Sequence, residues 1–154
     1  MTEFHDSTGR SWALILTIGS AKDIYDKTGV DLLNPTSLIR TNEEGIVDEN
    51  SIIFRFYTDD LFVSDIISNL VEKQAKERGM SKEDVLNLLD GETCKKAYDA
   101  FMKEYRNFFT ARGNVQGKKM VDMILQGLQS LAEELNGEKS SNSQDEQDSQ
   151  TSAS

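Results

Sequence analysis

The sequence predicts an α+β domain that is mostly helical, with an N-terminal β-hairpin of two or three strands packed on four or five helices. Apolar residues alternate near the start of the chain, as in a half-buried strand, and later recur at helical spacing. The last 18 residues include no aromatic residue and no aliphatic residue larger than alanine. We therefore expect one folded domain over residues 1–136, β-rich at 1–58 and helical at 59–136, and a disordered acidic tail at 137–154.

The start of the chain predicts the hairpin. The segment TEFH can form a first short strand, and DSTGR after it favours a tight turn. A two-stranded hairpin is marginal in water by itself, so we expect it to dock on the helices through Phe4 and Trp12. Every second residue of the following segment is apolar, which places four side chains on one face of the second strand: Trp12, Leu14, Leu16 and Ile18.

Residues 20–58 predict one short helix within a mostly irregular stretch. Ser20 suits the N-cap of a helix through AKDIYDKT, and Gly29 suits its C-cap. Ile24 and Tyr25 are the side chains of this helix that would point inward. The segment VDLL after the glycine predicts either a third strand or an apolar clasp. After a polar connection, SIIFRFY is rich in β-branched and aromatic residues, which favours a strand.

The helical part begins with two helices whose ends are marked in the sequence. An acidic start at Asp59 and a Lys/Arg-rich end before Gly79 fit the dipole of one long helix. Ser81 with Asp84 three residues later predicts a capping box for a second helix, which we expect to end at Gly91.

The last two predicted helices carry the widest apolar stripes, and Gly113 and Gly137 mark their ends. Packing against neighbouring helices is one account of these stripes. The other is partial exposure, which would make a groove for an apolar segment of a partner, with methionines supplying adaptable contacts. The candidate partner-binding residues are Phe101, Met102, Tyr105, Phe108, Phe109, Met120, Met123 and Leu128.

Composition argues against several classes of partner. The chain has 154 residues and a formal net charge of −10, and an acidic surface repels nucleic-acid phosphates. We find no basic patch that would reverse this, so we expect no direct nucleic-acid binding. A single cysteine, Cys94, permits no intrachain disulfide, which fits a reducing cytoplasm. No run of about 18 apolar residues occurs, so we expect no membrane span.

The residues that could carry chemistry are few and do not form motifs. His5 and Cys94 are the only histidine and cysteine, which is too few for a zinc site, and neither lies in a nucleophile motif. Aligning Gly45 of NEEGIVDENS with the glycine of a calcium loop puts Arg40 and Ser51 where carboxylates are needed. We therefore expect no enzyme, no cofactor and no metal site.

Four sequence motifs within residues 4–109, taken in their order along the chain, resemble those of a known protein family. They are F-x-D-x-x-GR-x-W-x-L-x-L, AKDIYDKTGVDLL, D-L-F-V-x-D-I-I-x-x-L-V-E-K-Q-A-x-x-R-G and S-K-E-D-V-L-x-L-L-D-G. In this respect the chain is similar to the tail assembly chaperones of double-stranded DNA tailed phages and prophages. The segment LNPTSLIRTNEEGIVDENS contributes little to the resemblance, and the C-terminal tail contributes nothing.

The resemblance implies a protein that coats the tape measure protein and keeps it soluble until tail tube subunits polymerise around it. It implies the tape measure protein as partner, with the tail tube protein as a second one. It also implies a location in the cytoplasm of the bacterial host and absence from the mature virion. Whether the chain forms a homo-oligomer, and whether a longer frameshifted form exists, the sequence leaves open.

Two other functions are compatible with the sequence. One is a structural tail or head-completion protein retained in the virion, which should form a stable ring. The other is an acidic regulator that occupies a basic cleft of a host protein, which would require carboxylates ordered on one rigid face.

Overall fold

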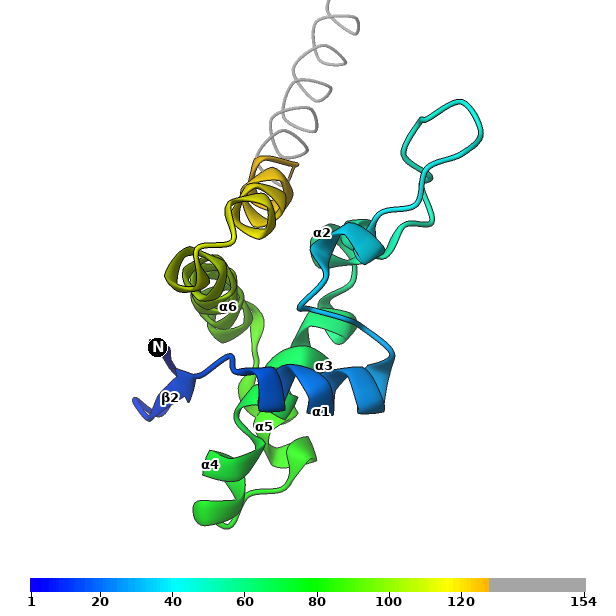
Figure 1. Cartoon of the computed structure of the whole chain (residues 1–154). Coiled ribbons are helices and arrows are strands. Elements are labelled where there is room, and N and C mark those ends of the chain that lie inside the picture. Colours follow the sequence, from blue (N-terminus) through cyan, green and yellow to red (C-terminus); the bar gives the residue numbers. More distant parts are fainter. Residues whose placement is uncertain (128–154) are drawn as a thin grey trace, which may run out of the picture. The chain divides into compact units, whose positions relative to one another are not determined.

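The computed structural model of the chain describes residues 1–127. The chain divides into two units, the first of residues 1–122 and the second beginning at residue 123. The first unit is mostly helical and begins with an antiparallel β-hairpin, so the predicted fold class is confirmed (Figure 1). The predicted domain end at residue 136 and the predicted disordered tail at 137–154 lie outside the described residues.

The hairpin consists of β1 (Thr2–His5) and β2 (Ser11–Leu14), with Phe4 opposite Trp12. Both of these anchor side chains are buried, as predicted. The inner face of the hairpin packs against α6 (Gly91–Arg112). The hydroxyl of Thr2 donates a hydrogen bond to the carbonyl of Ala100 in α6 (2.8 Å), which fixes β1 along this helix.

The turn between the strands is organised by the buried carboxylate of Asp6. Its Oδ1 accepts hydrogen bonds from the backbone and hydroxyl of Thr8 and from the backbone of Arg10, and its Oδ2 accepts one from Trp12 Nε1 (2.9 Å). Burial favours the neutral acid, but the hydrogen bonds from Thr8, Trp12 and Arg10 outweigh it and lower the pKa of Asp6 to about 2. The turn and the Trp12 anchor are therefore one hydrogen-bonded unit.

The second strand is shorter than predicted. It ends at Leu14, and Ile18 is not on the strand face but is the first residue of α1 (Ile18–Thr28), where it is 64% exposed. The cause is a capping box in which Thr17, not Ser20, is the N-cap and the two side chains bond each other's backbone N–H groups. This box starts the helix before the alternating pattern has finished.

The other predictions for α1 and the segment after it have mixed outcomes. The helix ends at Gly29, which is left-handed (φ 77°) as expected, and Ile24 is buried, but Tyr25 is 53% exposed. The segment after the glycine forms no strand. Val30 and Leu32 are both buried there, which agrees with the apolar clasp.

The strand predicted at SIIFRFY is wrong. Residues Ile52–Phe54 form a 3-10 turn, as Pro35–Leu38 do earlier, and Arg55–Thr58 form the short helix α2. Ile53 and Phe56 are buried three positions apart, which is a helical spacing. Packing of α2 against the next helix therefore overrides the β-propensity of the segment.

The long helix predicted from Asp59 is two helices, α3 (Asp60–Leu70) and α4 (Glu72–Glu77), separated at Val71. Asp59 is the N-cap of α3 and accepts a hydrogen bond from the backbone of Phe62 (3.0 Å). Within the first unit, α3 contacts α1, α2, α4, α5 and α6, so it is the central helix.

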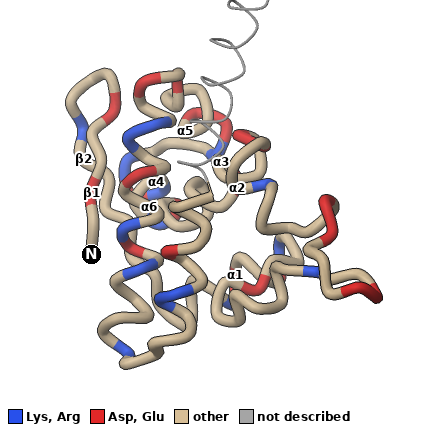
Figure 2. Tube along the Cα trace, turned by 90° about the horizontal axis from the view of Figure 1, so that it is seen from above, with Lys and Arg blue, Asp and Glu red and all other residues tan. Residues whose placement is uncertain are grey.

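The remaining helix ends follow local capping signals. The capping box of Ser81 and Asp84 starts α5 (Lys82–Leu88), as predicted. This helix ends at Leu88, with Leu89 as its C-cap, rather than at Gly91, which is instead the first residue of α6. Gly113 ends α6 in a left-handed conformation (φ 75°), as predicted, and residues 115–127 are helical. Acidic and basic segments are interspersed along the trace of the described residues (Figure 2).

Candidate functional site

The aromatic stripe of α6 forms the core of the first unit. The side chains of Phe101, Tyr105 and Phe109 have no exposed surface, and Met102 is 1% exposed. The ring centroid of Tyr105 lies 5.6 Å from that of Phe101 and 5.3 Å from that of Phe109. The Tyr105 hydroxyl donates a hydrogen bond to the Leu32 carbonyl (2.6 Å), and burial raises the pKa of Tyr105. These four predicted partner-binding residues are therefore packed in the core of the first unit.

The other four predicted residues have different surroundings. Phe108 is half-buried, and its ring meets that of Phe109 edge-on at 5.4 Å. Met120 is also half-buried. Met123 belongs to the second unit and is 53% exposed. Leu128 lies outside the described residues. Of the predicted set in the first unit, Phe108 and Met120 are thus the side chains that retain surface.

Phe108 lies in a groove of about 550 Å³ on the first unit. The Met1 and Ile18 side chains beside it are exposed, at 74% and 64%. Apolar side chains therefore gather here at the surface instead of in the core. We call this feature the Phe108 groove; it is lined by Met1, Leu16, Ile18, Glu104, Phe108 and Ala111, together with the polar Asn107 and the cationic Arg112.

A buried carboxylate fixes the wall of the Phe108 groove. Glu104 on α6 is only 5% exposed, and its Oε1 accepts a hydrogen bond from the backbone N–H of Leu16 (3.2 Å). The ammonium nitrogen of Met1 lies 3.2 Å from Oε2, close enough for an ion pair although its direction makes no hydrogen bond. These contacts hold both ends of the hairpin against α6.

The sequence did not point to Met1, Leu16 or Ile18 as surface residues of one groove. The alternating pattern predicts Leu16 and Ile18 on one strand face, whereas Leu16 is buried and Ile18 is exposed. Thr17 was the signal that could have separated them, because threonine is favoured at an N-cap, although Ser20 stands where a capping box usually has Glu or Gln.

Among the described residues, neither the histidine nor the cysteine of the chain lies beside a group that would activate it. His5 is exposed on β1, and Cys94 is half-buried on α6 with its Sγ 4.0 Å from the Ser64 hydroxyl. Among residues 1–127, no three His, Cys, Asp or Glu side chains are grouped so that they could hold a metal ion.

The acidic loop between Arg40 and Ser51 is closed by its own hydrogen bonds. Arg40 N donates to the Ser51 hydroxyl (2.8 Å), which donates in turn to the Arg40 carbonyl (3.1 Å). Asn42 Oδ1 accepts from the backbone N–H groups of Glu44 and Ile46. The two end positions of the failed calcium-loop pattern thus bond to each other.

In the part of the chain that the structure describes, no helix is both long enough and apolar enough to cross a membrane. Comparisons of the chain with protein-family models, with curated proteins and with solved structures gave no match. What the protein does must therefore be inferred from its own residues.

Proposed function

We propose that this protein is a tail assembly chaperone of a tailed phage or prophage, which binds the tape measure protein and keeps it soluble until the tail tube polymerises. The observation that carries the proposal is the Phe108 groove, where the exposed Met1 and Ile18 flank a half-buried aromatic ring. The resemblance of the motifs within residues 4–109 supports the choice of family.

The groove suits an apolar side chain from a helical segment of the partner. Removing an isoleucine or phenylalanine side chain from water contributes roughly 1.5–3 kcal/mol. Ile18 and Phe108 offer part of that surface before any partner is bound. One such contact is weak, but many copies along one long partner bind with avidity and can still leave one at a time.

The charge of the chain fits the same role. A formal net charge of −10 makes copies of the protein repel one another, which keeps a complex with an apolar partner dispersed. An acidic surface also leaves the phage DNA in the same cell unbound.

Co-expression tests the proposal. The tape measure protein encoded nearest to this chain is produced with and without it, and the soluble fraction is measured by sedimentation. We expect the wild-type protein to keep the tape measure protein soluble and to co-purify with it. Ile18→Glu should abolish this effect, because it puts a charge in the Phe108 groove.

Leu61→Glu is the matched control, because Leu61 is even more exposed (84%) and lies outside the Phe108 groove. This variant should behave as the wild type does. Both variants replace an exposed aliphatic residue in the first turn of a helix, so neither should alter the fold. Equal activity of the two variants, or a tape measure protein that stays insoluble in every case, would contradict the proposal.

Purified virions separate this function from that of a retained structural protein. A chaperone leaves before the particle is complete, so mass spectrometry of purified virions should detect tube subunits and not this chain. A stoichiometric ring of the chain in the virion would favour the structural alternative.

A further inference from the structure

The two edges of the β-hairpin differ in whether their outward-pointing backbone groups are hydrogen-bonded. On the β2 edge, the amide of Gln74 from α4 bonds both backbone groups of Ala13, accepting from its N–H (2.9 Å) and donating to its carbonyl (2.6 Å). Arg78 Nη2 donates to the Ser11 carbonyl beside it (2.8 Å). Side chains thus occupy the positions that a neighbouring strand would take.

On the β1 edge, the backbone groups of Glu3 and His5 have no partner among the described residues. The Asp6 N–H bonds the Arg10 carbonyl (3.0 Å), which makes Asp6 and Arg10 a hydrogen-bonded pair of the hairpin. Hydrogen-bonded and non-bonded pairs alternate in an antiparallel ladder. In the register with Phe4 opposite Trp12, the N–H and C=O groups of Glu3 and His5 therefore point away from β2.

The bonds on the other edge check this alternation independently. Ala13 lies opposite Glu3 in the register, and its backbone groups also point out of the hairpin, toward Gln74. The free edge of β1 is therefore a ready template for another strand.

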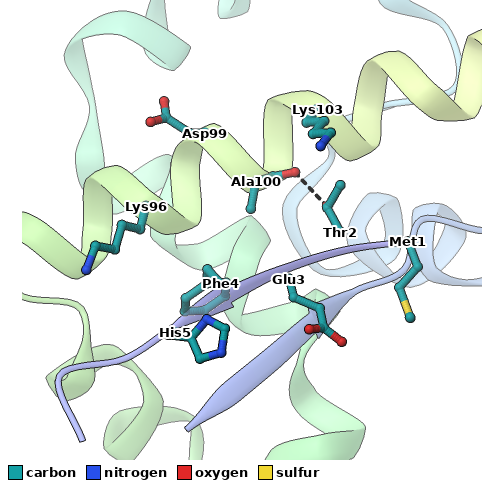
Figure 3. A pocket seen from close by; sticks show the side chains of 9 residues that line it. All are labelled: Met1, Thr2, Glu3, Phe4, His5, Lys96, Asp99, Ala100 and Lys103. Carbon is teal, nitrogen blue, oxygen red and sulfur yellow. Dashed lines mark hydrogen bonds between the residues drawn. The ribbon is translucent and has the colours of Figure 1, made fainter. Parts of the chain in front are cut away.

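A groove of about 670 Å³ runs along this free edge (Figure 3). We call it the β1-edge groove, and α6 supplies its other wall through Lys96, Asp99, Ala100 and Lys103. β1 is already fixed on α6 by the hydrogen bond from Thr2 to Ala100. An edge that is ordered beforehand loses little conformational entropy when it binds.

The two lysines of the β1-edge groove favour an acidic segment, because both carboxylates that line it are engaged elsewhere: Asp99 pairs with Lys95 outside the groove (3.9 Å), and Glu3 bonds Ser11. Lys96 and Lys103 are both exposed and lie seven residues apart on α6, which corresponds to about 10.5 Å along the helix. Lys96 pairs with Glu92 (3.2 Å), and Lys103 has no ion pair with any described residue. The carboxylate of Glu3 bonds the Ser11 hydroxyl (3.1 Å), on the side of β2.

We propose that an extended, acidic segment of a partner protein adds to the free edge of β1 as a third strand. Its backbone bonds the N–H and C=O groups of Glu3 and His5, and its carboxylates pair with Lys96 and Lys103. Alternate strand residues face the same side at intervals of about 6.8 Å, so carboxylates two or four positions apart reach both lysines. Met1 lines both this groove and the Phe108 groove, but strand addition at β1 does not rest on the function proposed for the Phe108 groove.

A second copy of the chain fits the β1-edge groove less well than a partner segment does. Pairing β1 with β1 of another copy would bring two α6 helices beneath strands about 4.8 Å apart. Helices pack at 8–10 Å, so the two copies would collide there. A single extended segment has no such helix.

A synthetic peptide tests the proposal on the full-length protein. The probe is a fluorescein-labelled nine-residue peptide of alternating Glu and Thr, and the control peptide alternates Lys and Thr. At 150 mM salt, fluorescence anisotropy should show binding of the acidic peptide that is at least tenfold tighter than that of the basic one. In amide exchange measured by NMR, binding should slow exchange at Glu3 and His5 at least fivefold.

Charge reversal locates the binding site. Lys96→Glu with Lys103→Glu should weaken binding of the acidic peptide at least tenfold. The control pair, Lys22→Glu with Lys73→Glu, makes the same change of charge at exposed lysines outside the β1-edge groove and should weaken it less than twofold. His5→Pro removes one outward N–H without removing a bond of the hairpin, and it should also weaken binding.

Three results would overturn the proposal. One is binding that the two charge-reversed pairs weaken equally, which would indicate general electrostatic attraction. Another is peptide binding that leaves the exchange of the Glu3 and His5 amides unchanged. The third is protection of these amides from exchange in the absence of peptide, if that protection grows with protein concentration. Such a result would mean that two copies pair through β1. The exchange measurement on the wild-type protein decides the question even if a variant does not fold.

Discussion

Phe108 and Phe109 are neighbours in α6 and touch each other, yet they belong to two different regions of the molecule. Phe109 lies in the row of stacked rings inside the first unit and is fully buried. Phe108 lies about 100° further round the helix, in the Phe108 groove, with Met1 and Ile18 exposed beside it. An amphipathic helix usually has one apolar face for the core. Here apolar residues extend past that face, and the excess is the surface that we assign to a partner.

The sharpest test of this contrast is truncation of each ring in turn. Phe109→Ala should destabilise the fold by about 3–5 kcal/mol, because it leaves a cavity in a packed interior. Phe108→Ala removes a half-exposed ring and should cost about 1–2 kcal/mol. Urea unfolding followed by circular dichroism measures both. Equal losses for the two variants would remove the distinction between the regions.

Trp12→Ala extends the test to the hairpin that covers α6. Trp12 is 1% exposed, donates a hydrogen bond to Asp6, and stacks under the guanidinium of Arg78, which lies 4.3 Å from its ring centroid. We expect a loss of about 3–5 kcal/mol. A melting temperature that does not change would show that the hairpin is not part of the core.

Gly117→Ala tests how tightly the ring of Phe109 is enclosed. A Cβ atom added at Gly117 would lie 2.5 Å from Cδ1 of Phe109, closer than carbon atoms approach without displacement. We expect destabilisation of about 1–3 kcal/mol from overpacking. Gly91→Ala is the control, because no atom lies within 4 Å of a Cβ there, and it should be close to neutral. A thermal melt of the two variants compares them directly.

Acid should weaken the hairpin turn before it affects the aromatic core around α6. Because the pKa of Asp6 is lowered from 3.8 to about 2 in the folded protein, its contribution is complete above pH 4 and is lost as the pH falls from 4 to 2. The contribution is at most about 2.5 kcal/mol. Thermal melts between pH 2 and pH 7 should show this loss in the wild type, and Asp6→Asn should lack this part of the profile.

The elements that could be predicted from the sequence are those whose signals are local. Ser81 with Asp84 and the two glycines at 29 and 113 mark helix ends through bonds within a few residues, and all three are confirmed. The segment around Phe56 was misjudged because its β-branched composition does not reveal the helix that packs on it.

The candidate site could be predicted only in part, for a similar reason. Helical periodicity correctly grouped Phe101, Tyr105 and Phe109 on one face. It could not show that this face is covered, since coverage depends on residues such as Leu32 that are distant in the sequence. Nor could it place Ile18 beside Phe108, because that depends on where one helix begins.

The side chains of Gln74 and Arg78 have one more consequence, for how copies of this chain behave when crowded. A hairpin open on both sides could join head to tail with the next copy, and the resulting ribbon would have no natural end. With Gln74 and Arg78 seated on β2, any such stacking stops after a single addition. Copies of the protein that crowd together therefore cannot extend into an open-ended ribbon through this hairpin.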